Sequence, residues 1–144
     1  MTVRGADKLI RQLQKLPMDL RSGIGSALTL SVVEMDAYAK QHISGGGRSG
    51  RTYRRRSVTH QASAPGEFPK TDTGQLVGSL FFRVASDKLS AFFGTKLAYG
   101  RYLEFGTSRM RARPWLAPTF RALKDKITSR VKAAVNEALR KSRV

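Results

Sequence analysis

The chain of 144 residues contains no cysteine, one tryptophan and only two histidines. The absence of cysteine excludes disulfide bonds, zinc sites built on thiolates and cysteine nucleophiles, and it fits a protein made in a reducing cytosol. The two histidines, His42 and His60, lack the acidic or histidine neighbours that would complete a metal site. We therefore predict no metal site and no cofactor.

Long apolar runs are also missing. No stretch approaches the roughly 18 uninterrupted apolar residues that a membrane helix requires. The first eight residues are polar and reach charged side chains before any apolar run, which is not the pattern of a signal peptide. We expect a soluble protein that is made in the cytoplasm.

Acidic residues are scarce, since 10 Asp and Glu stand against 27 Lys and Arg, which gives a formal net charge of +17. This excess predicts an anionic partner, and the candidates are nucleic acid, an anionic membrane and the acidic face of another protein. The pair of acids that most suggests acid–base catalysis is Glu67 and Asp72. Because prolines and a Thr-Gly turn surround them, we expect Asp72 to cap the structure that follows. We predict no catalytic residue.

Three segments have apolar residues at intervals of three or four, the period of a helix. They are residues 9–16, 19–43 and 120–138. Pro17 ends the first segment, Gly45-Gly46-Gly47 ends the second, and Pro114 to Pro118 opens the third. The sequence thus predicts two N-terminal helices and a long C-terminal helix.

Apolar residues alternate with a period of two on both sides of a turn at Ser86 to Lys88. They are Leu76, Leu80, Phe82, Val84, Leu89, Ala91 and Phe93. This pattern predicts a β-hairpin, with Phe81 and Phe92 making its second face partly apolar. A helical turn over residues 98–106 would be capped by Gly106. The predicted fold class is α+β: N-terminal helices, a long basic loop, a small antiparallel sheet and a C-terminal helix in one domain, 1–144.

The segment of residues 44–73 is rich in glycine, proline and serine and has little apolar periodicity. Loops this long inside small domains are uncommon and tend to be functional or disordered. We predict a mobile basic loop that lines a DNA channel or binds a partner, and the alternative of a solvated loop stays open. Its candidate binding residues are Arg48, Arg51, Tyr53, Arg54, Arg55 and Arg56.

Two segments contain distinctive motifs. The first motif segment, residues 60–79, contains Ala-Ser-Ala-Pro-Gly-Glu followed by Asp-Thr-Gly and Leu, with Ser79 in place. The second, residues 99–118, contains Leu-Glu-Phe-Gly-Thr and then Arg-Pro-Trp-Leu with Pro118. Together they resemble the phage tail-component family named for gene product ten of a lambdoid siphophage. The departures are Trp115, where phenylalanine is commoner, and Lys70, which replaces a small residue. The resemblance spans nearly the whole chain.

The resemblance implies a structural role without catalysis, in a neck or tail-completion ring that joins head to tail in the virion. Its partners would be copies of itself, head-closure or connector proteins, tail-tube or tail-terminator proteins and packaged DNA, with no membrane. Six subunits would match the tail tube and are favoured, whereas twelve would match the portal. The candidate interface and motif residues are Asp72, Gly74, Tyr99, Tyr102, Glu104, Phe105, Gly106, Thr107, Arg113, Pro114 and Trp115.

Two rival functions fit the composition less well. A sequence-independent nucleic-acid-binding protein would use the +17 charge, but the chain has no recognisable DNA-reading or RNA-binding motif. A nuclease would need clustered carboxylates for metal ions, and the acids here are dispersed. Oligomerisation without DNA separates the ring from the first rival, and cleavage of DNA with magnesium or manganese tests the second.

Overall fold

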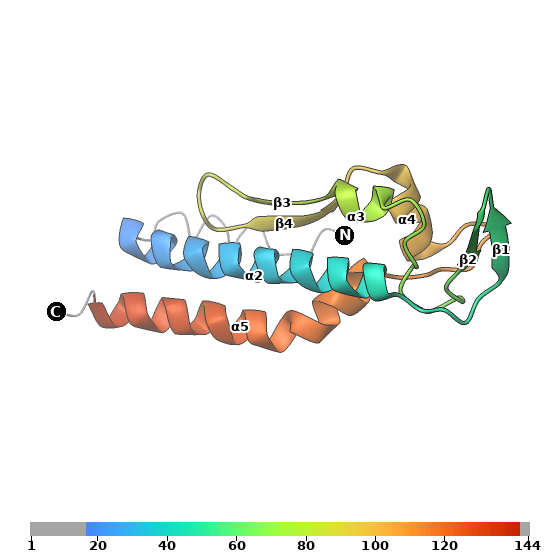
Figure 1. The fold of residues 1–144 in the computed structure, drawn as a ribbon. Coiled ribbons are helices and arrows are strands. Elements are labelled where there is room, and N and C mark those ends of the chain that lie inside the picture. The colour runs from blue at the N-terminus through green and yellow to red at the C-terminus, as the bar shows by residue number, and fades with distance from the viewer. Residues whose placement is uncertain (1–16, 142–144) are drawn as a thin grey trace. The chain divides into compact units, whose positions relative to one another are not determined.

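The computed structural model describes residues 17–141 as four helices and two antiparallel hairpins (Figure 1). The helices are α2 (Met18–Gly45), α3 (Gln75–Ser79), α4 (Ala98–Phe105) and α5 (Leu116–Lys141). One hairpin pairs β1 (Thr52–Arg55) with β2 (Val58–Gln61), and the other pairs β3 (Leu80–Val84) with β4 (Ala91–Thr95). The predicted α+β class is confirmed. The helix predicted for residues 9–16 lies outside the described residues.

The described residues fold into two compact units. Unit 1 contains residues 17–33, 82–92 and 124–141, and unit 2 contains residues 34–81 and 93–123. Helices α2 and α5 and the β3–β4 hairpin therefore contribute residues to both units. The hairpin predicted around Ser86 is confirmed, and α2 ends within the glycine run that was expected to stop it.

The core of unit 1 is small. Leu20 and Ile24 of α2 pack with Leu89, which follows the turn between β3 and β4, and Val135 of α5 covers this cluster. Gly25 allows the turn to approach α2, because a Cβ atom there would lie 2.7 Å from the Cβ of Lys88. Unit 1 thus depends on close contact at a position where only glycine fits.

The core of unit 2 is larger and gathers buried residues from α2, α3, β3 and α4, together with Trp115, which directly precedes α5. Its buried members are Ala39, Ile43, Leu76, Leu80, Leu103 and Trp115. The Trp115 ring packs edge-on against Phe93, with 6.1 Å between ring centroids. Its indole N–H donates to the backbone oxygen of Gly100 at 2.9 Å, so the polar edge of this buried aromatic residue is satisfied.

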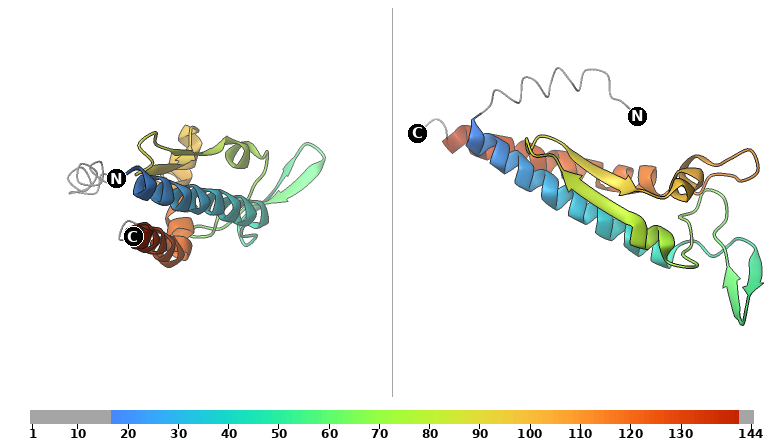
Figure 2. Two further views of the ribbon diagram at one scale, coloured as in Figure 1. Left: turned by 90° about the vertical axis from the view of Figure 1, so that its left-hand side faces the viewer. Right: turned by 90° about the horizontal axis from the view of Figure 1, so that it is seen from above.

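Three local predictions are wrong. The segment of residues 44–73 is not an uninterrupted loop, because β1 and β2 form a hairpin within it; both views show this hairpin extending beyond the carboxyl end of α2 (Figures 1 and 2). Leu76 belongs to helix α3 and not to the strand, which begins at Leu80. Phe120, expected on the buried stripe of α5, is 49% exposed. In each case the local sequence pattern left the secondary structure or the burial ambiguous, and tertiary contacts determined it.

Truncation of the unit 2 core tests its importance. We expect Leu103→Ala to lower the free energy of unfolding by about 2–5 kcal/mol, because Leu103 is 2% exposed and its removal would leave a cavity. Leu30→Ala, at a position 60% exposed on α2, is the matched control and should change stability by less than about 0.5 kcal/mol. Urea unfolding followed by circular dichroism measures both, and equal losses would contradict the assigned core.

Candidate functional site

Glu104 caps the amino terminus of helix α5, although it lies in another helix. One carboxylate oxygen accepts the backbone N–H groups of Trp115 and Leu116, each at 2.8 Å, and the other accepts that of Ala117 at 2.9 Å. The first N–H groups of a helix have no partners inside it, and the positive end of the helix dipole favours a carboxylate. Glu104 therefore fixes the end of α4 to the start of α5.

The remainder of the second motif segment makes the tight connection that this cap requires. Helix α4 ends at Gly106, whose φ of 74° is a backbone conformation that favours glycine. A Cβ atom on Gly106 would also lie 2.8 Å from the Met110 carbonyl oxygen. Thr107 and Met110 then form a short antiparallel bridge, which turns the chain back towards α5. The glycine in Glu-Phe-Gly-Thr is thus required by the fold.

The two motif segments are joined by Arg113. Its backbone N–H donates to the Leu103 carbonyl oxygen at 2.7 Å. Its guanidinium Nε donates to the backbone oxygen of Ser63, in the first motif segment, at 2.9 Å. The backbone N–H of Gly66 donates to the Ala112 carbonyl oxygen at 2.9 Å. One hydrogen bond from the Arg113 side chain to the backbone of Ser63 and one between the backbones of Gly66 and Ala112 therefore hold the two motif segments together.

Glu67 anchors the glycine-rich stretch that follows α2. Its carboxylate accepts the Ala64 backbone N–H at 2.8 Å and the hydroxyl of Ser49. The hydrogen bond from Ser49 and that from Ala64 lower the pKa of Glu67 below its usual range. Glu67 thus fixes the geometry of the loop through its hydrogen bonds with Ser49 and Ala64.

Asp72 does not cap helix α3, contrary to our prediction. The N-cap residue is Gly74, with a φ of 76° and no side-chain hydrogen bond. The Asp72 carboxylate instead accepts hydrogen bonds from the Tyr53 hydroxyl at 3.2 Å and the Arg55 guanidinium at 3.0 Å. His60 Nδ1 lies 3.9 Å from its other oxygen. Asp72 therefore binds the β1–β2 hairpin, and only the tertiary structure could show this.

The candidate basic residues lie in and before the β1–β2 hairpin. Arg48 and Arg51 precede it, Arg54 and Arg55 are in β1, and Arg56 is in the turn with a φ of 55°. All five are exposed. Only Arg55 forms an ion pair among the residues that the structure describes, so four arginines present uncompensated positive charge on a single short segment.

Aromatic side chains form an exposed face on helix α4. Tyr99, Tyr102 and Phe105 are 55%, 50% and 78% exposed, and their spacing of three residues places them on one side of the helix. Gly100, on the opposite side of α4, is buried, and Leu103, one turn after Tyr99, is buried in the unit 2 core. The rings therefore face away from the core while the backbone beneath them is fixed by the Glu104 cap.

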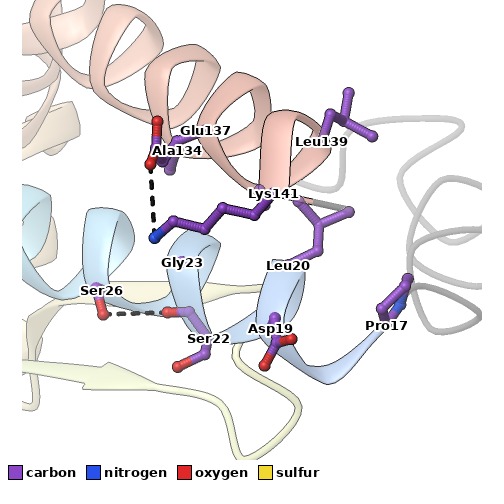
Figure 3. Close-up of a pocket in the computed structure, with 11 residues that line it drawn as sticks. Pro17, Asp19, Leu20, Ser22, Gly23, Ser26, Ala134, Glu137, Leu139 and Lys141 are labelled. Atoms are coloured by element: carbon purple, nitrogen blue, oxygen red, sulfur yellow. Dashed lines mark hydrogen bonds and ion pairs between the residues drawn. The ribbon is translucent and has the colours of Figure 1, made fainter. Parts of the chain in front are cut away.

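Each of the two units contains a hollow. In unit 1, a hollow of about 510 Å³ between α2 and α5 is lined mainly by small and apolar residues such as Leu20 and Gly23, with the Glu137–Lys141 ion pair at its edge (Figure 3). In unit 2, residues 69–76 and Tyr99 enclose about 260 Å³. No group of three or more potential metal ligands occurs within residues 17–141. Nor is any helix there long and apolar enough to cross a membrane.

Sequence reasoning missed the roles of Ser63, Gly100 and Asp72. Ser63 is 2% exposed and binds Arg113 through its backbone oxygen, a contact that no sequence pattern reports. Gly100 is buried, and a Cβ atom there would lie 2.3 Å from the Thr95 side chain. Its position between two tyrosines of the motif was the only available signal.

Loss of the Glu104 carboxylate should weaken the link between α4 and α5. We expect Glu104→Gln to lower the free energy of unfolding by about 1–3 kcal/mol, because an amide nitrogen would replace one of two oxygens that accept backbone N–H groups. Glu137→Gln, which weakens the two surface ion pairs with Arg140 and Lys141 on α5, should cost less than about 0.5 kcal/mol. Thermal and urea unfolding measure both, and a silent Glu104→Gln would contradict the capping role.

The titration of Glu67 is a second prediction. Because the pKa of Glu67 is lowered in the folded protein, its contacts add stability above the ordinary value of 4.5 and lose it as the pH falls through the folded value. Ser49→Ala should raise the pKa of Glu67, since the Ser49 hydroxyl is the main cause of the shift. Ser57→Ala is the control. Carboxyl NMR titrations measure the midpoint, and an equal midpoint in all three proteins would refute the contact.

Comparisons with protein-family models, with curated proteins and with solved structures find no match for this chain. The contacts between the two motif segments bring them together at the junction of α4 and α5, with the aromatic face of α4 on the outside.

Proposed function

We propose that this chain is a non-catalytic structural subunit of a neck or tail-completion ring that joins head to tail in a tailed phage. The observation that carries the proposal is the exposed aromatic face of α4, formed by Tyr99, Tyr102 and Phe105. Clustered exposed aromatic residues are typical of sites that bind other proteins, and aromatic residues are enriched at interfaces. The same three residues belong to the second motif segment.

The construction of the α4 face supports this role. Helix α4 is only eight residues long, and short helices have little stability of their own. The Glu104 cap, Gly106 and Trp115 nevertheless fix it at both ends, so its outer rings are presented without a further ordering cost. A preorganised face of this kind binds a neighbour more tightly than a loose one. Repeated head to tail around an axis, it would close a cyclic oligomer.

The β3–β4 hairpin offers a second surface of the same character. Phe92 in unit 1 is 50% exposed, and the guanidinium of Arg83 lies 5.3 Å from the centre of its ring on the same face of the hairpin. Phe82, which is 41% exposed, belongs to the other face, because side chains alternate along a strand. In unit 2, Phe81 is 37% exposed beneath Lys96. Exposed phenylalanines with arginine beside them fit an interface better than a solvent-facing strand. We propose that both surfaces contact neighbouring proteins in the ring, with six copies favoured.

Removal of the gene from a phage that carries it tests the proposal. Electron microscopy should show separate DNA-filled heads and finished tails, and heads that still join tails normally would make the proposal wrong. Phe105→Ser should reproduce the defect and reduce ring formation by the purified protein, as measured by mass photometry without DNA. Phe120→Ser, which replaces a phenylalanine that is 49% exposed on α5, is the matched control and should leave joining intact.

A further inference from the structure

The β1–β2 hairpin has two chemically different faces. The strand register pairs Tyr53 with His60 and Arg54 with Thr59. Because side chains alternate along a strand and directly paired residues share a face, each face carries four side chains. The inner face consists of Tyr53, Arg55, Val58 and His60, and the outer face consists of Thr52, Arg54, Thr59 and Gln61.

The inner face is occupied by contacts within the subunit. Asp72 accepts hydrogen bonds from Tyr53 and Arg55 and lies near His60. Burial and the negative charge of Asp72 raise the pKa of Tyr53, which keeps its hydroxyl protonated as a donor. The hairpin is therefore held to the chain just before α3 through one face. Because the inner face is held in this way, the outer face of the hairpin is turned away from Asp72.

The outer face presents hydrogen-bond donors and no large apolar side chain. Arg54, Thr52 and Thr59 are exposed, and Arg54 makes no ion pair with residues 17–141. The hairpin's large apolar residues, Tyr53 and Val58, belong to the inner face. A docking site for a protein would be expected to have apolar or aromatic anchors at its centre. Guanidinium and hydroxyl groups without such anchors are typical of contacts to phosphates.

We propose that the outer face of the β1–β2 hairpin binds the backbone phosphates of DNA without regard to sequence, with Arg54 as the central contact and Asp72 as the positioning residue. The guanidinium fork matches two phosphate oxygens, and the paired Thr59 supplies a hydroxyl at the same level of the hairpin. Arg48 and Arg51, both exposed, add positive charge on the segment that leads into β1.

This inference deepens the proposed function and rests on it for its biological place, since a neck ring encloses the path of the packaged DNA. The outer-face contact can nevertheless fail while the ring still forms. The two outcomes are separated by measuring ring formation and DNA binding on the same preparations. A ring without DNA binding overturns the inference alone, whereas DNA binding by a protein that forms no ring overturns the proposed function alone.

The first test compares Arg54→Gln with Arg121→Gln, since both remove one exposed positive charge from unit 2. Binding of a fluorescent duplex is measured by anisotropy over a series of salt concentrations. We expect Arg54→Gln to weaken binding several-fold and to reduce the slope of log K against log salt by about 1, the effect of one lost phosphate contact. Arg121→Gln should leave the slope unchanged, and Arg54→Lys should restore it. Equal effects of the two Gln variants would overturn the proposal.

The second test concerns Asp72. If only net charge attracted DNA, Asp72→Asn would strengthen binding, as would Asp125→Asn on α5. We expect the opposite for Asp72→Asn, a loss of about twofold or more, because the neutral amide weakens the charge-assisted hydrogen bonds from Tyr53 and Arg55 that orient the hairpin. Equal gains in both variants would show that the Asp72 contact does not position the surface, and would overturn its assigned role.

A third arm identifies the class of partner. A polyglutamate peptide replaces DNA as a competitor at the same concentration of negative charge. Unlabelled duplex should displace the probe far more effectively, because the arginine fork fits phosphate oxygens that recur at regular spacing. If polyglutamate competes equally well and Arg54→Gln weakens both ligands alike, the surface fits an acidic protein and the DNA proposal is wrong. Circular dichroism of each variant confirms that the fold is retained.

Discussion

The hydrogen bonds between the Glu104 carboxylate and the first backbone N–H groups of α5 are the constraint on which unit 2 depends. They fix a short helix to the start of a long one, and the intervening chain must then make a sharp return, which Gly106 allows. The same hydrogen bonds position Trp115, because its backbone N–H donates to Glu104 while its ring is buried in the core of unit 2. The residues Glu-Phe-Gly-Thr and Arg-Pro-Trp thus together form the connection between α4 and α5.

The connection between α4 and α5 contains two kinds of residue. Some make contacts inside the subunit, and others are exposed and free to contact partners. Glu104, Gly106, Arg113 and Trp115 make contacts inside unit 2, so folding alone accounts for these four residues of the second motif segment. Tyr99, Tyr102 and Phe105 extend outward from the backbone that these residues fix. Their interface role stays a prediction, and the fold provides no internal reason for three exposed aromatic rings.

The Asp72 carboxylate fixes the orientation of the basic β1–β2 hairpin. Asp72 binds one face of the β1–β2 hairpin and leaves Arg54 on the other face. An arginine-rich loop without such a contact would have to lose conformational freedom each time it bound an anion. A hairpin that is already paired and anchored avoids most of that cost. The segment predicted as a mobile loop is therefore better understood as a preorganised basic arm.

The amino-acid pattern predicts those elements whose apolar periodicity is long or ends at a clear glycine or proline. Helix α2, helix α5, the β3–β4 hairpin and the Gly106 cap follow from periodicity, glycine and proline, which act over a few residues. Only the tertiary structure decided that residues 52–61 pair as strands, that Leu76 is helical and that Asp72 binds Tyr53 and Arg55. These outcomes depend on contacts such as that between Tyr53 and Asp72, 19 positions apart, which local propensity does not encode. The sequence therefore specified the chemistry of the motif residues, and the fold specified which of them face inward.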